Sequence, residues 1–307
     1  MNDPIVMLCP GQGAQHVGMG RAWNEQVPAA AEVFDRAEAI LGDTLGSPLR
    51  SVCFDGPAEA LNRTNISQPA IFVCSMACFA GLEATTGTIT MHATAGLSLG
   101  EYTALCLAGV LSFEDALRLV TERGRLMQEA ADASQGGMVA LIGADEDQAE
   151  AVCARARQGE VLVCANFNAP GQIVLSGHDT ACARAIAIAA EDGLRAAPLS
   201  VAGAFHSPLM QPAADGLTSA LADTPVHTAR YEVWSNVTGQ PHNLEDAELL
   251  KQRLVEQLVR PVRWSESCLE LAKRHMIGYH ELAPGSVLRG LMRRIDRTVK
   301  VMSHEEP

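Results

Sequence analysis

The chain of 307 residues contains 48% hydrophobic and 19% charged residues. This share of apolar side chains fills a sizeable core, which excludes a disordered chain, and the length predicts one large domain or two unequal ones. The net charge of −13 argues against nucleic acid as a partner, because a protein that covers a phosphate backbone needs a basic face.

The cysteines and the N-terminal residues indicate the cellular compartment. The nine cysteines are an odd number, lie mostly in apolar runs and include no Cys-x-x-Cys pair. We interpret them as small core residues in a reducing cytosol rather than as a disulfide framework or a metal site. The N-terminus lacks the pattern of a signal or transit peptide, and no stretch of about 18 residues is free of both charges and turn breakers. We therefore expect a soluble, cytoplasmic protein without membrane contact.

Strand and helix patterns alternate in the first part of the chain. Ile5 to Cys9 is a short apolar run that ends in a Gly-rich turn, which is typical of a buried strand followed by a loop. Residues 88–95 are rich in β-branched side chains and predict a second core strand. Helical patterns cover residues 29–41, 58–61, 69–82, 101–108 and 112–131. The third of these is apolar on nearly all sides, as expected of a helix in the middle of a core. This alternation predicts an α/β fold.

The pattern changes between residues 136 and 199. Strand patterns cover residues 138–143, 161–168, 172–177 and 195–199, and helical patterns cover residues 146–158 and 180–191. The order β-α-β-β-α-β is that of a ferredoxin-like unit. Strands and helices resume near His206. We therefore assign residues 135–200 to a small inserted subdomain and residues 1–134 and 201–307 to a large α/β domain.

Gly96-Leu97-Ser98-Leu99-Gly100 is the sharpest local motif. In Gly-x-Ser-x-Gly the serine occupies a strained strand-to-helix turn, where the glycines avoid collisions and the hydroxyl stands at a helix N-terminus. Its position after an apolar strand suits a nucleophile. The alternative is structural, because Ser98 and Glu101 have the spacing of a capping box, which explains the serine without catalysis.

A serine nucleophile needs a base, and His206 has the most suitable position among the nine histidines. It follows a predicted strand, and the next residues, Ser207 and Pro208, suit the first positions of a helix. A loop beside a rigid element can carry a base to a serine that is distant in the sequence. A structural or solvent-exposed histidine is the alternative.

Arg123 lacks the acidic neighbour that the other arginines of its helix have. Arg118 precedes Glu122, and Arg125 precedes Glu129, by four residues, which predicts two surface ion pairs. The neighbours of Arg123 at three and four positions are all apolar: Leu119, Val120, Leu126 and Met127. A cation directed into a core needs an anion. Either a buried acid supplies it, or it arrives with the substrate, because the arginine fork binds a carboxylate through two hydrogen bonds.

Gln12 stands in the loop after the first predicted strand. Backbone N–H groups that such a turn exposes can form half of an oxyanion hole, and the N–H of the residue after the nucleophile, Leu99, can form the other half. An ordinary turn is the alternative explanation of this glycine-rich segment.

Together these segments resemble the malonyl-CoA:acyl carrier protein transacylase family, relatives of the acyltransferase domains of fatty acid and polyketide synthases. The matching motifs occur in the order of the family and span most of the chain. They are Pro10-Gly11-Gln12-Gly13-Ala14-Gln15, Ser67-Gln68-Pro69-Ala70, Gly96-Leu97-Ser98-Leu99-Gly100-Glu101-Tyr102, Arg123-Gly124, Asn166-Phe167-Asn168-Ala169-Pro170-Gly171-Gln172, Gly203-Ala204-Phe205-His206-Ser207-Pro208-Leu209-Met210, Gln257 with the segment up to Trp264, and Glu281-Leu282-Ala283-Pro284-Gly285.

The resemblance implies an α/β-hydrolase-like core with an inserted ferredoxin-like (βαββαβ) subdomain, in agreement with the pattern of elements. It implies Ser98 as the acyl-accepting nucleophile and His206 as its base. It also implies that a carbonyl of Gln257, rather than an aspartate, orients the histidine. For Gln257 alone, a helix-surface position is the alternative.

The resemblance further implies that Arg123 binds the free carboxylate of malonate and that the backbone amides of Gln12 and Leu99 form the oxyanion hole. The phenylalanine before His206 matches the form of this segment that selects malonyl rather than methylmalonyl. One position departs from the family, which commonly has histidine before the nucleophile where this chain has Leu97. Because that side chain flanks the mouth of the turn, we expect altered acyl-chain fit or rate rather than loss of activity.

The implied reaction transfers malonyl from malonyl-CoA to the phosphopantetheine thiol of acyl carrier protein in two ping-pong steps, and it calls for no metal or redox cofactor. Its product feeds fatty acid or polyketide synthesis. One alternative is a hydrolase that clears acyl groups from carriers, against which Arg123 argues, because neutral acyl groups need no carboxylate clamp. The other is a non-catalytic carrier-binding protein in which Ser98 is a helix cap.

Docking of an acidic carrier on this acidic chain needs a local basic patch. Two groups of basic residues are candidates: Arg289, Arg293, Arg294, Arg297 and Lys300 near the C-terminus, and Arg260 with Arg263. We expect the C-terminal group to dock the carrier, with a solvated helix face as the alternative. We expect the chain to be a monomer.

Overall fold

Five parallel strands form the larger of two sheets. The computed structural model describes residues 5–274 and 278–307, so that His275, to which the sequence gives no role, lies outside it. The sheet order is β7-β2-β1-β8-β9, and all neighbouring strands are parallel. The strands are β1 (Ile5–Cys9), β2 (Met91–Gly96), β7 (Glu232–Trp234), β8 (Gly278–Leu282) and β9 (Val301–His304). All five residues of β1 are buried, as expected of a central parallel strand that helices cover on both faces.

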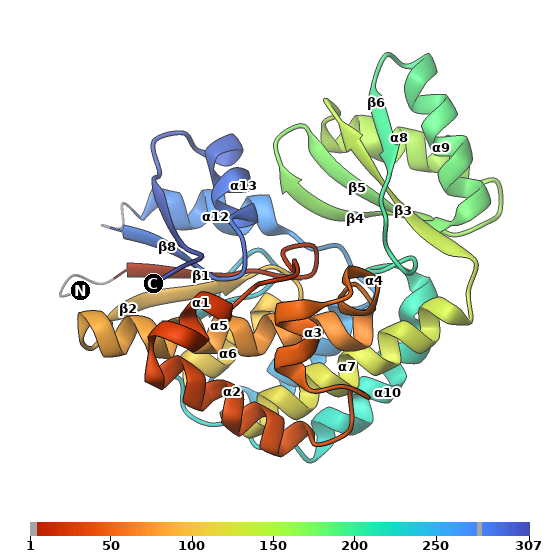
Figure 1. Cartoon of the computed structure of the whole chain (residues 1–307). Coiled ribbons are helices and arrows are strands. Elements are labelled where there is room, and N and C mark those ends of the chain that lie inside the picture. The colour runs from red at the N-terminus through yellow and green to blue at the C-terminus, as the bar shows by residue number, and fades with distance from the viewer. Residues whose placement is uncertain (1–4, 275–277) are drawn as a thin grey trace.

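Helices cover both faces of this sheet (Figure 1). One face carries α1 (Arg21–Gln26), α2 (Pro28–Leu41), α3 (Leu49–Asp55), α4 (Ala58–Leu61), α5 (Thr64–Thr86), α6 (Gly100–Leu107), α7 (Phe113–Asp132), α10 (Gln211–Ala222) and α11 (Ala247–Glu256). The other face carries α12 (Trp264–Lys273) and α13 (Val287–Ile295). Alternate residues of β1 join the two apolar cores: Met7 packs with the helices of the first face, and Leu8 with α12 and α13. The layers are those of an α/β fold.

Helix α5 is the central helix of the larger core. It is long and apolar enough to cross a membrane by length and composition, yet 61% of its most apolar window is buried inside the fold. It packs between α2 and α7. Its apolar character therefore reflects burial on all sides, as the sequence predicted, although the helix begins at Thr64 rather than at Pro69. Pro69 therefore lies inside the helix, where proline leaves one backbone hydrogen bond of the helix unmade.

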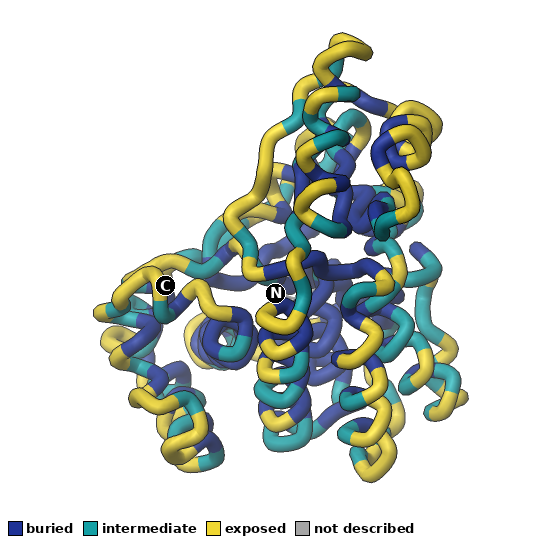
Figure 2. The backbone as a smooth tube through the Cα atoms, turned by 90° about the vertical axis from the view of Figure 1, so that its right-hand side faces the viewer, coloured by how far each residue is buried: buried dark blue, intermediate teal, exposed yellow. Residues whose placement is uncertain are grey.

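The second part of the molecule is a small subdomain that follows α7. It consists of β3 (Gly136–Ile142), α8 (Glu146–Arg157), β4 (Leu162–Ala169), β5 (Gln172–His178), α9 (Asp179–Glu191) and β6 (Arg195–Pro198). The strands form an antiparallel sheet in the order β4-β5-β3-β6, which is the predicted ferredoxin-like arrangement. Its apolar residues form a separate cluster around Val139, Leu175 and Ala185. Figure 2 shows buried residues concentrated inside both parts and exposed residues on their outer turns.

The small subdomain is joined to the large part by more than its two chain connections. The Val262 N–H donates to the Ala165 carbonyl over 2.8 Å, and the Phe167 N–H donates to the Val262 carbonyl over 2.9 Å. The Arg263 guanidinium lies 4.7 Å from the centre of the Phe167 ring, and its Nη1 lies 3.1 Å from Glu146 Oε1 on α8. Edge strand β4 is therefore attached to the segment that precedes α12.

One predicted ion pair is wrong and one is confirmed. Arg125 pairs with Glu129 as predicted, with Nη1 and Oε1 2.5 Å apart. Glu122, however, pairs with Arg125 at 2.6 Å, and Arg118 lies 3.8 Å from Asp115. Both observed partners are three residues away, a spacing that meets on a helix surface as well as four does. All nine cysteines are buried free thiols, as predicted.

Candidate active site

The turn after β2 holds Ser98 in a strained backbone conformation. Among the described non-glycine residues, only Ser98, Gln158 and His206 have positive φ, and that of Ser98 is 53°. The turn is compact, because a Cβ on Gly96 or on Gly100 would collide with neighbouring backbone. The strand, the tight turn and the following helix that the glycine spacing predicted are therefore present.

Ser98 is not a helix cap. Helix α6 begins at Gly100 with Leu99 at the N-cap position, and no side chain caps it. The Ser98 N–H donates to Asn236 Oδ1 over 2.6 Å instead of to Glu101, the partner that a capping box requires. The structural explanation of the serine therefore does not hold, and its side chain is available to the adjacent cavity.

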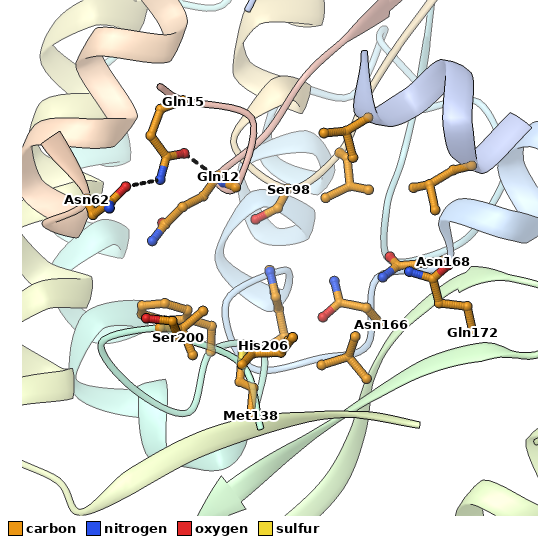
Figure 3. Close-up of a pocket in the computed structure, with 18 of the residues that line it drawn as sticks. Gln12, Gln15, Asn62, Ser98, Met138, Asn166, Asn168, Gln172, Ser200 and His206 are labelled. Carbon is orange, nitrogen blue, oxygen red and sulfur yellow. Dashed lines mark hydrogen bonds between the residues drawn. The ribbon is translucent and has the colours of Figure 1, made fainter. Parts of the chain in front are cut away.

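The His206 ring is held from behind by a backbone carbonyl. Its Nδ1–H donates to the Gln257 oxygen over 2.7 Å, which leaves Nε2 as the free nitrogen of the ring. His206 has φ of 56° and is 4% exposed. The hydroxyl of Ser207 accepts from the Leu209 N–H over 3.2 Å at the start of a short 3-10 helix, as the sequence predicted. Figure 3 shows the ring directed toward Ser98 across the cavity.

The surroundings of His206 favour the neutral imidazole. Burial lowers the pKa of His206 to about 4, the hydrogen bond to the Gln257 carbonyl acts in the opposite direction, and the positive charge of Arg123 adds to the lowering. The ring is therefore neutral near pH 7. Neutral imidazole is the form that can accept a proton from a hydroxyl.

Arg123 lies next to Ser98, and its hydrogen-bond partners are all neutral. On α7 it is 1% exposed. Its Nη1 donates to Gln68 Oε1 over 2.6 Å, and its Nη2 donates to Ser98 Oγ over 3.0 Å. The guanidinium carbon lies 5.4 Å from the centre of the Tyr102 ring, a cation–π distance.

No acidic side chain that the structure describes is bonded to the buried guanidinium of Arg123. Within residues 5–274 and 278–307 it forms no ion pair, and its Nε has no hydrogen-bond partner. Burial lowers the pKa of Arg123, and the nearby Tyr102 and Glu101 offset only part of this effect. Of the two explanations that the sequence left open, a buried acid bonded to Arg123 is not found among the described residues.

Gln257 forms hydrogen bonds with His206, Ser98 and Arg123. It follows the last residue of α11 and is 1% exposed, so a helix-surface position is excluded. Its backbone carbonyl accepts from His206, and its side-chain Oε1 accepts from Arg123 Nη2 over 2.9 Å. Its Nε2 donates to the Ser98 carbonyl over 3.0 Å. The structure thus brings Ser98, His206, Arg123 and Gln257 together from four separate segments.

The loop after β1 and the turn after β2 provide backbone N–H groups beside Ser98. In the described part of the chain, neither the Gln12 N–H nor the Leu99 N–H donates a hydrogen bond to the protein. The Gln12 side chain lies in the cavity wall (Figure 3), with its Nε2 3.4 Å from Thr64 Oγ1. Free donors next to a nucleophile are what an oxyanion hole requires.

A cavity of about 320 Å³ opens between the two parts of the molecule beside Ser98 and His206. The small subdomain contributes amide side chains to its wall, and helix α13 contributes apolar ones. The amides are Asn166, Asn168 and Gln172, the α13 residues are Val287 and Leu291, and the small subdomain also contributes the apolar Met138 and Val174. Leu97 also lines this cavity. A cleft of mixed apolar and amide character at a junction of two bodies is typical of an organic ligand site.

Sequence reasoning missed the residues that support this arrangement from behind. Asn236 Nδ2 donates to the Gly96 carbonyl over 2.7 Å, so that Asn236 holds both sides of the Ser98 turn. Glu101 Oε1 lies 2.6 Å from His242 Nε2. Gln68 was part of a matched motif but had no role. Asn236 and His242 lie more than 130 residues from their partners, so no local pattern could reveal these contacts. For Glu101, the periodicity of the helix after Ser98 was the only available signal that its side chain faces the interior.

The two basic groups differ in their surroundings. Arg289, Arg293, Arg294, Arg297 and Lys300 are all exposed on or after α13, and none of them forms an ion pair with a residue that the structure describes. By contrast, Arg260 lies 3.9 Å from Glu256, and Arg263 lies 3.1 Å from Glu146. The C-terminal group is therefore a basic surface without acidic partners among the described residues, and it lies on and after α13, whose Val287 and Leu291 line the cavity.

Comparisons with known proteins place this geometry in a family. The family model of the acyl transferase domain matches residues 6–305. The malonyl CoA-acyl carrier protein transacylase of Bacillus subtilis is 41% identical over 305 residues, which cover 99% of this chain and 94% of that protein. The Escherichia coli (strain K12) transacylase is 40% identical over 304 residues, with 99% and 96% covered.

Solved structures agree with the sequence matches. The crystal structure of malonyl-CoA:acyl carrier protein transacylase from Xanthomonas oryzae has a TM-score of 0.93 and 39% identity, and it covers 100% of this chain and 96% of that one. A malonyl-transacylase solved in complex with a type II polyketide synthase acyl carrier protein has a TM-score of 0.93 and 35% identity, with 99% and 96% covered. The chain therefore belongs to the malonyl-CoA:acyl carrier protein transacylase family.

Proposed function

We propose that this chain transfers a malonyl group from malonyl-CoA to the phosphopantetheine thiol of acyl carrier protein through an ester on Ser98. The activity is that of its family, and it supplies malonyl units for fatty acid or polyketide synthesis. The observation that carries the assignment of residues is a buried arginine, bonded only to neutral groups, whose Nη2 lies 3.0 Å from the hydroxyl of the nucleophile. A substrate that is at once a thioester and a carboxylate satisfies both groups.

In the first half-reaction, Ser98 Oγ attacks the thioester carbon while His206 Nε2 accepts its proton. The developing oxyanion accepts hydrogen bonds from the N–H groups of Gln12 and Leu99. The C–S bond breaks, the proton on His206 passes to the CoA sulfur, and malonyl remains as an ester on Ser98. Hydrogen bonds from Arg123 to the malonyl carboxylate hold the other end of the group.

In the second half-reaction, the carrier thiol takes the place of CoA. His206 accepts the thiol proton, the sulfur attacks the ester carbonyl, and the same two N–H groups stabilise the oxyanion. The C–O bond to Ser98 breaks and His206 returns the proton to Oγ. The Gln257 carbonyl keeps the ring in the tautomer that this exchange needs, because it accepts from Nδ1–H.

The surroundings of the site support further parts of the proposal. Residues 135–200 form the small subdomain, with residues 1–134 and 201–307 as the large domain, in line with the separate apolar clusters. The exposed C-terminal basic group docks the acidic carrier beside the cavity mouth. The protein acts in the cytoplasm, consistent with its nine free cysteines, and it acts as a monomer.

Intact mass spectrometry after brief exposure to malonyl-CoA, or separately to acetyl-CoA, tests the reaction. We expect a malonyl adduct that exceeds the acetyl adduct, is absent in Ser98→Ala and persists in Ser134→Ala, which changes a serine two residues beyond the end of α7. Added holo acyl carrier protein then gains the malonyl mass. An adduct that is lost to water without reaching the carrier indicates a hydrolase, and no adduct at all contradicts the role of Ser98.

A further inference from the structure

Glu101 is a fully buried carboxylate behind the nucleophile turn, and the reaction above does not use it. It is 0% exposed on the first turn of α6. Three donors surround it: His242 Nε2 at 2.6 Å from Oε1, and Gln257 Nε2 at 2.7 Å and the Asn236 N–H at 3.1 Å from Oε2. A carboxylate only accepts hydrogen bonds, so this set of donors matches its ionised form.

The bond from Gln257 to Glu101 decides which way the Gln257 amide faces. The two ends of an amide side chain have nearly the same shape, so their hydrogen-bond partners determine the orientation. Here Nε2 has two acceptors, Glu101 Oε2 and the Ser98 carbonyl. Oε1 is therefore the end that faces Arg123 Nη2, at 2.9 Å.

The opposite orientation of the amide is incompatible with Arg123. A flipped Gln257 places its NH₂ group against the Nη2 of Arg123, so that two donors face each other and a buried cation loses an acceptor. Arg123 Nη2 also donates to Ser98 Oγ. Displacement of the guanidinium thus changes the distance between the group that binds the carboxylate and the hydroxyl that attacks the thioester.

We propose that Glu101, itself held by His242, is a positioning residue that sets the malonyl preference by fixing the Gln257 amide against Arg123. This inference rests on the proposed function. Glu101 is not a general base for Ser98, because it is fully buried, is absent from the cavity wall and does not bond Ser98 Oγ, whose partner is Arg123.

The test compares how fast Ser98 is loaded from malonyl-CoA and from acetyl-CoA in single turnovers followed by intact mass. Glu101→Met keeps the volume and removes the acceptors, and we expect the malonyl-over-acetyl ratio to fall about tenfold, the effect of one hydrogen bond to a charged group. Glu101→Gln retains an oxygen for Gln257, while its amide donates to the other tautomer of His242. We expect it to keep the ratio within about threefold of the unmodified chain.

Two further variants separate positioning from general destabilisation. Thr94→Val is the structural control, because Thr94 Oγ1 bonds the Ala104 and Glu232 carbonyls in the same layer without touching Gln257 or Arg123. It should lower the melting temperature and leave the ratio unchanged. In a Gln257→Ala background, which keeps the carbonyl that holds His206, Glu101→Met should change the ratio no further, because the two residues act in one chain of contacts.

An unchanged ratio in folded Glu101→Met, with slower loading from both substrates, overturns the proposal. So does an equal loss in Glu101→Gln and Glu101→Met, which would assign the effect to charge rather than to orientation. If Glu101→Met does not fold, His242→Leu carries the test, because it releases Glu101 from one side, and an unchanged ratio there again overturns it. If the unmodified chain forms no ester on Ser98, the proposed function fails and this inference fails with it.

Discussion

The two sheets contribute differently to the cavity that they enclose. The parallel sheet ends in the tight turns that carry Ser98 and the N–H groups beside it, and the helices packed on it hold Arg123 and Gln257 in buried hydrogen bonds. The antiparallel sheet supplies uncharged walls, such as Asn168, Gln172 and Val174. Under the proposed function, the large part performs the chemistry and selects the carboxylate, while the small subdomain shapes the cleft for the rest of the substrate.

The largest effect expected from this division between the two parts is that of removing the proposed base, His206. His206→Ala removes the proton acceptor and should slow single-turnover loading of Ser98 by about two to four orders of magnitude, with little change in the KM for malonyl-CoA. The measurement is the loading rate at saturating malonyl-CoA. A higher KM with an unchanged loading rate would mean that His206 contributes to substrate binding and not to proton transfer.

The pH profile of the unmodified chain sharpens the same prediction. Because burial lowers the pKa of His206 to about 4, the ring stays neutral as the pH falls from 8 to about 5, and loading should remain constant over that range. Below that pKa the ring gains a proton and the rate should fall tenfold per pH unit. An inflection near the ordinary histidine value of about 6.5, in protein shown to be folded, would contradict the burial argument.

Arg123 tests whether selection of the carboxylate also belongs to the large part. Arg123→Met keeps an unbranched apolar stem and removes the fork. Since hydrogen bonds to a charged carboxylate contribute about 1.5 to 3 kcal/mol each, the malonyl-over-acetyl preference should fall by about two to four orders of magnitude. Arg125→Met, on the exposed side of the same helix with its two glutamates, is the matched control and should leave the preference intact.

A substitution in the small subdomain should have the smallest effect on the kinetics of loading. Asn168 lines the cavity, and its Oδ1 is buried without a hydrogen-bond partner among the described residues, so it is available to a polar group of a bound thioester arm. Asn168→Ala should raise the KM for malonyl-CoA by about three- to tenfold, the effect of one neutral hydrogen bond, with kcat retained. A fall in kcat with constant KM would place part of the chemistry on the antiparallel sheet.

Local patterns account for what the sequence could predict. The helices and strands were recognised because their burial sets the pattern of apolar residues along the chain. β1, buried on both faces, is a continuous apolar run, and strand and helical patterns alternate along the small subdomain. Ser98 was recognisable because the glycines that its turn needs lie two positions away on either side. Arg123 was recognisable by its apolar neighbours, a property of one helix.

The remaining features depend on contacts between distant segments. The pairing of Glu122 with Arg125 instead of Arg118 is a choice between equivalent spacings, which side-chain packing decides. The sequence analysis gave His242 no role, and its partner Glu101 lies 141 residues away. The orientation of Gln257 follows from three such contacts at once.

The attachment of β4 to Val262 limits how the cleft can move. A body connected to its neighbour only where the chain enters and leaves can swing about that line, as domains on a hinge do. Here the backbone hydrogen bonds of Val262 with Ala165 and Phe167 add a third fastening from another part of the chain. Val262 is only five residues from Gln257, so the wall of the cleft and the carbonyl that orients the base share one short stretch of backbone. A change in the spacing between this wall and the proposed base would therefore stretch or break these two backbone hydrogen bonds.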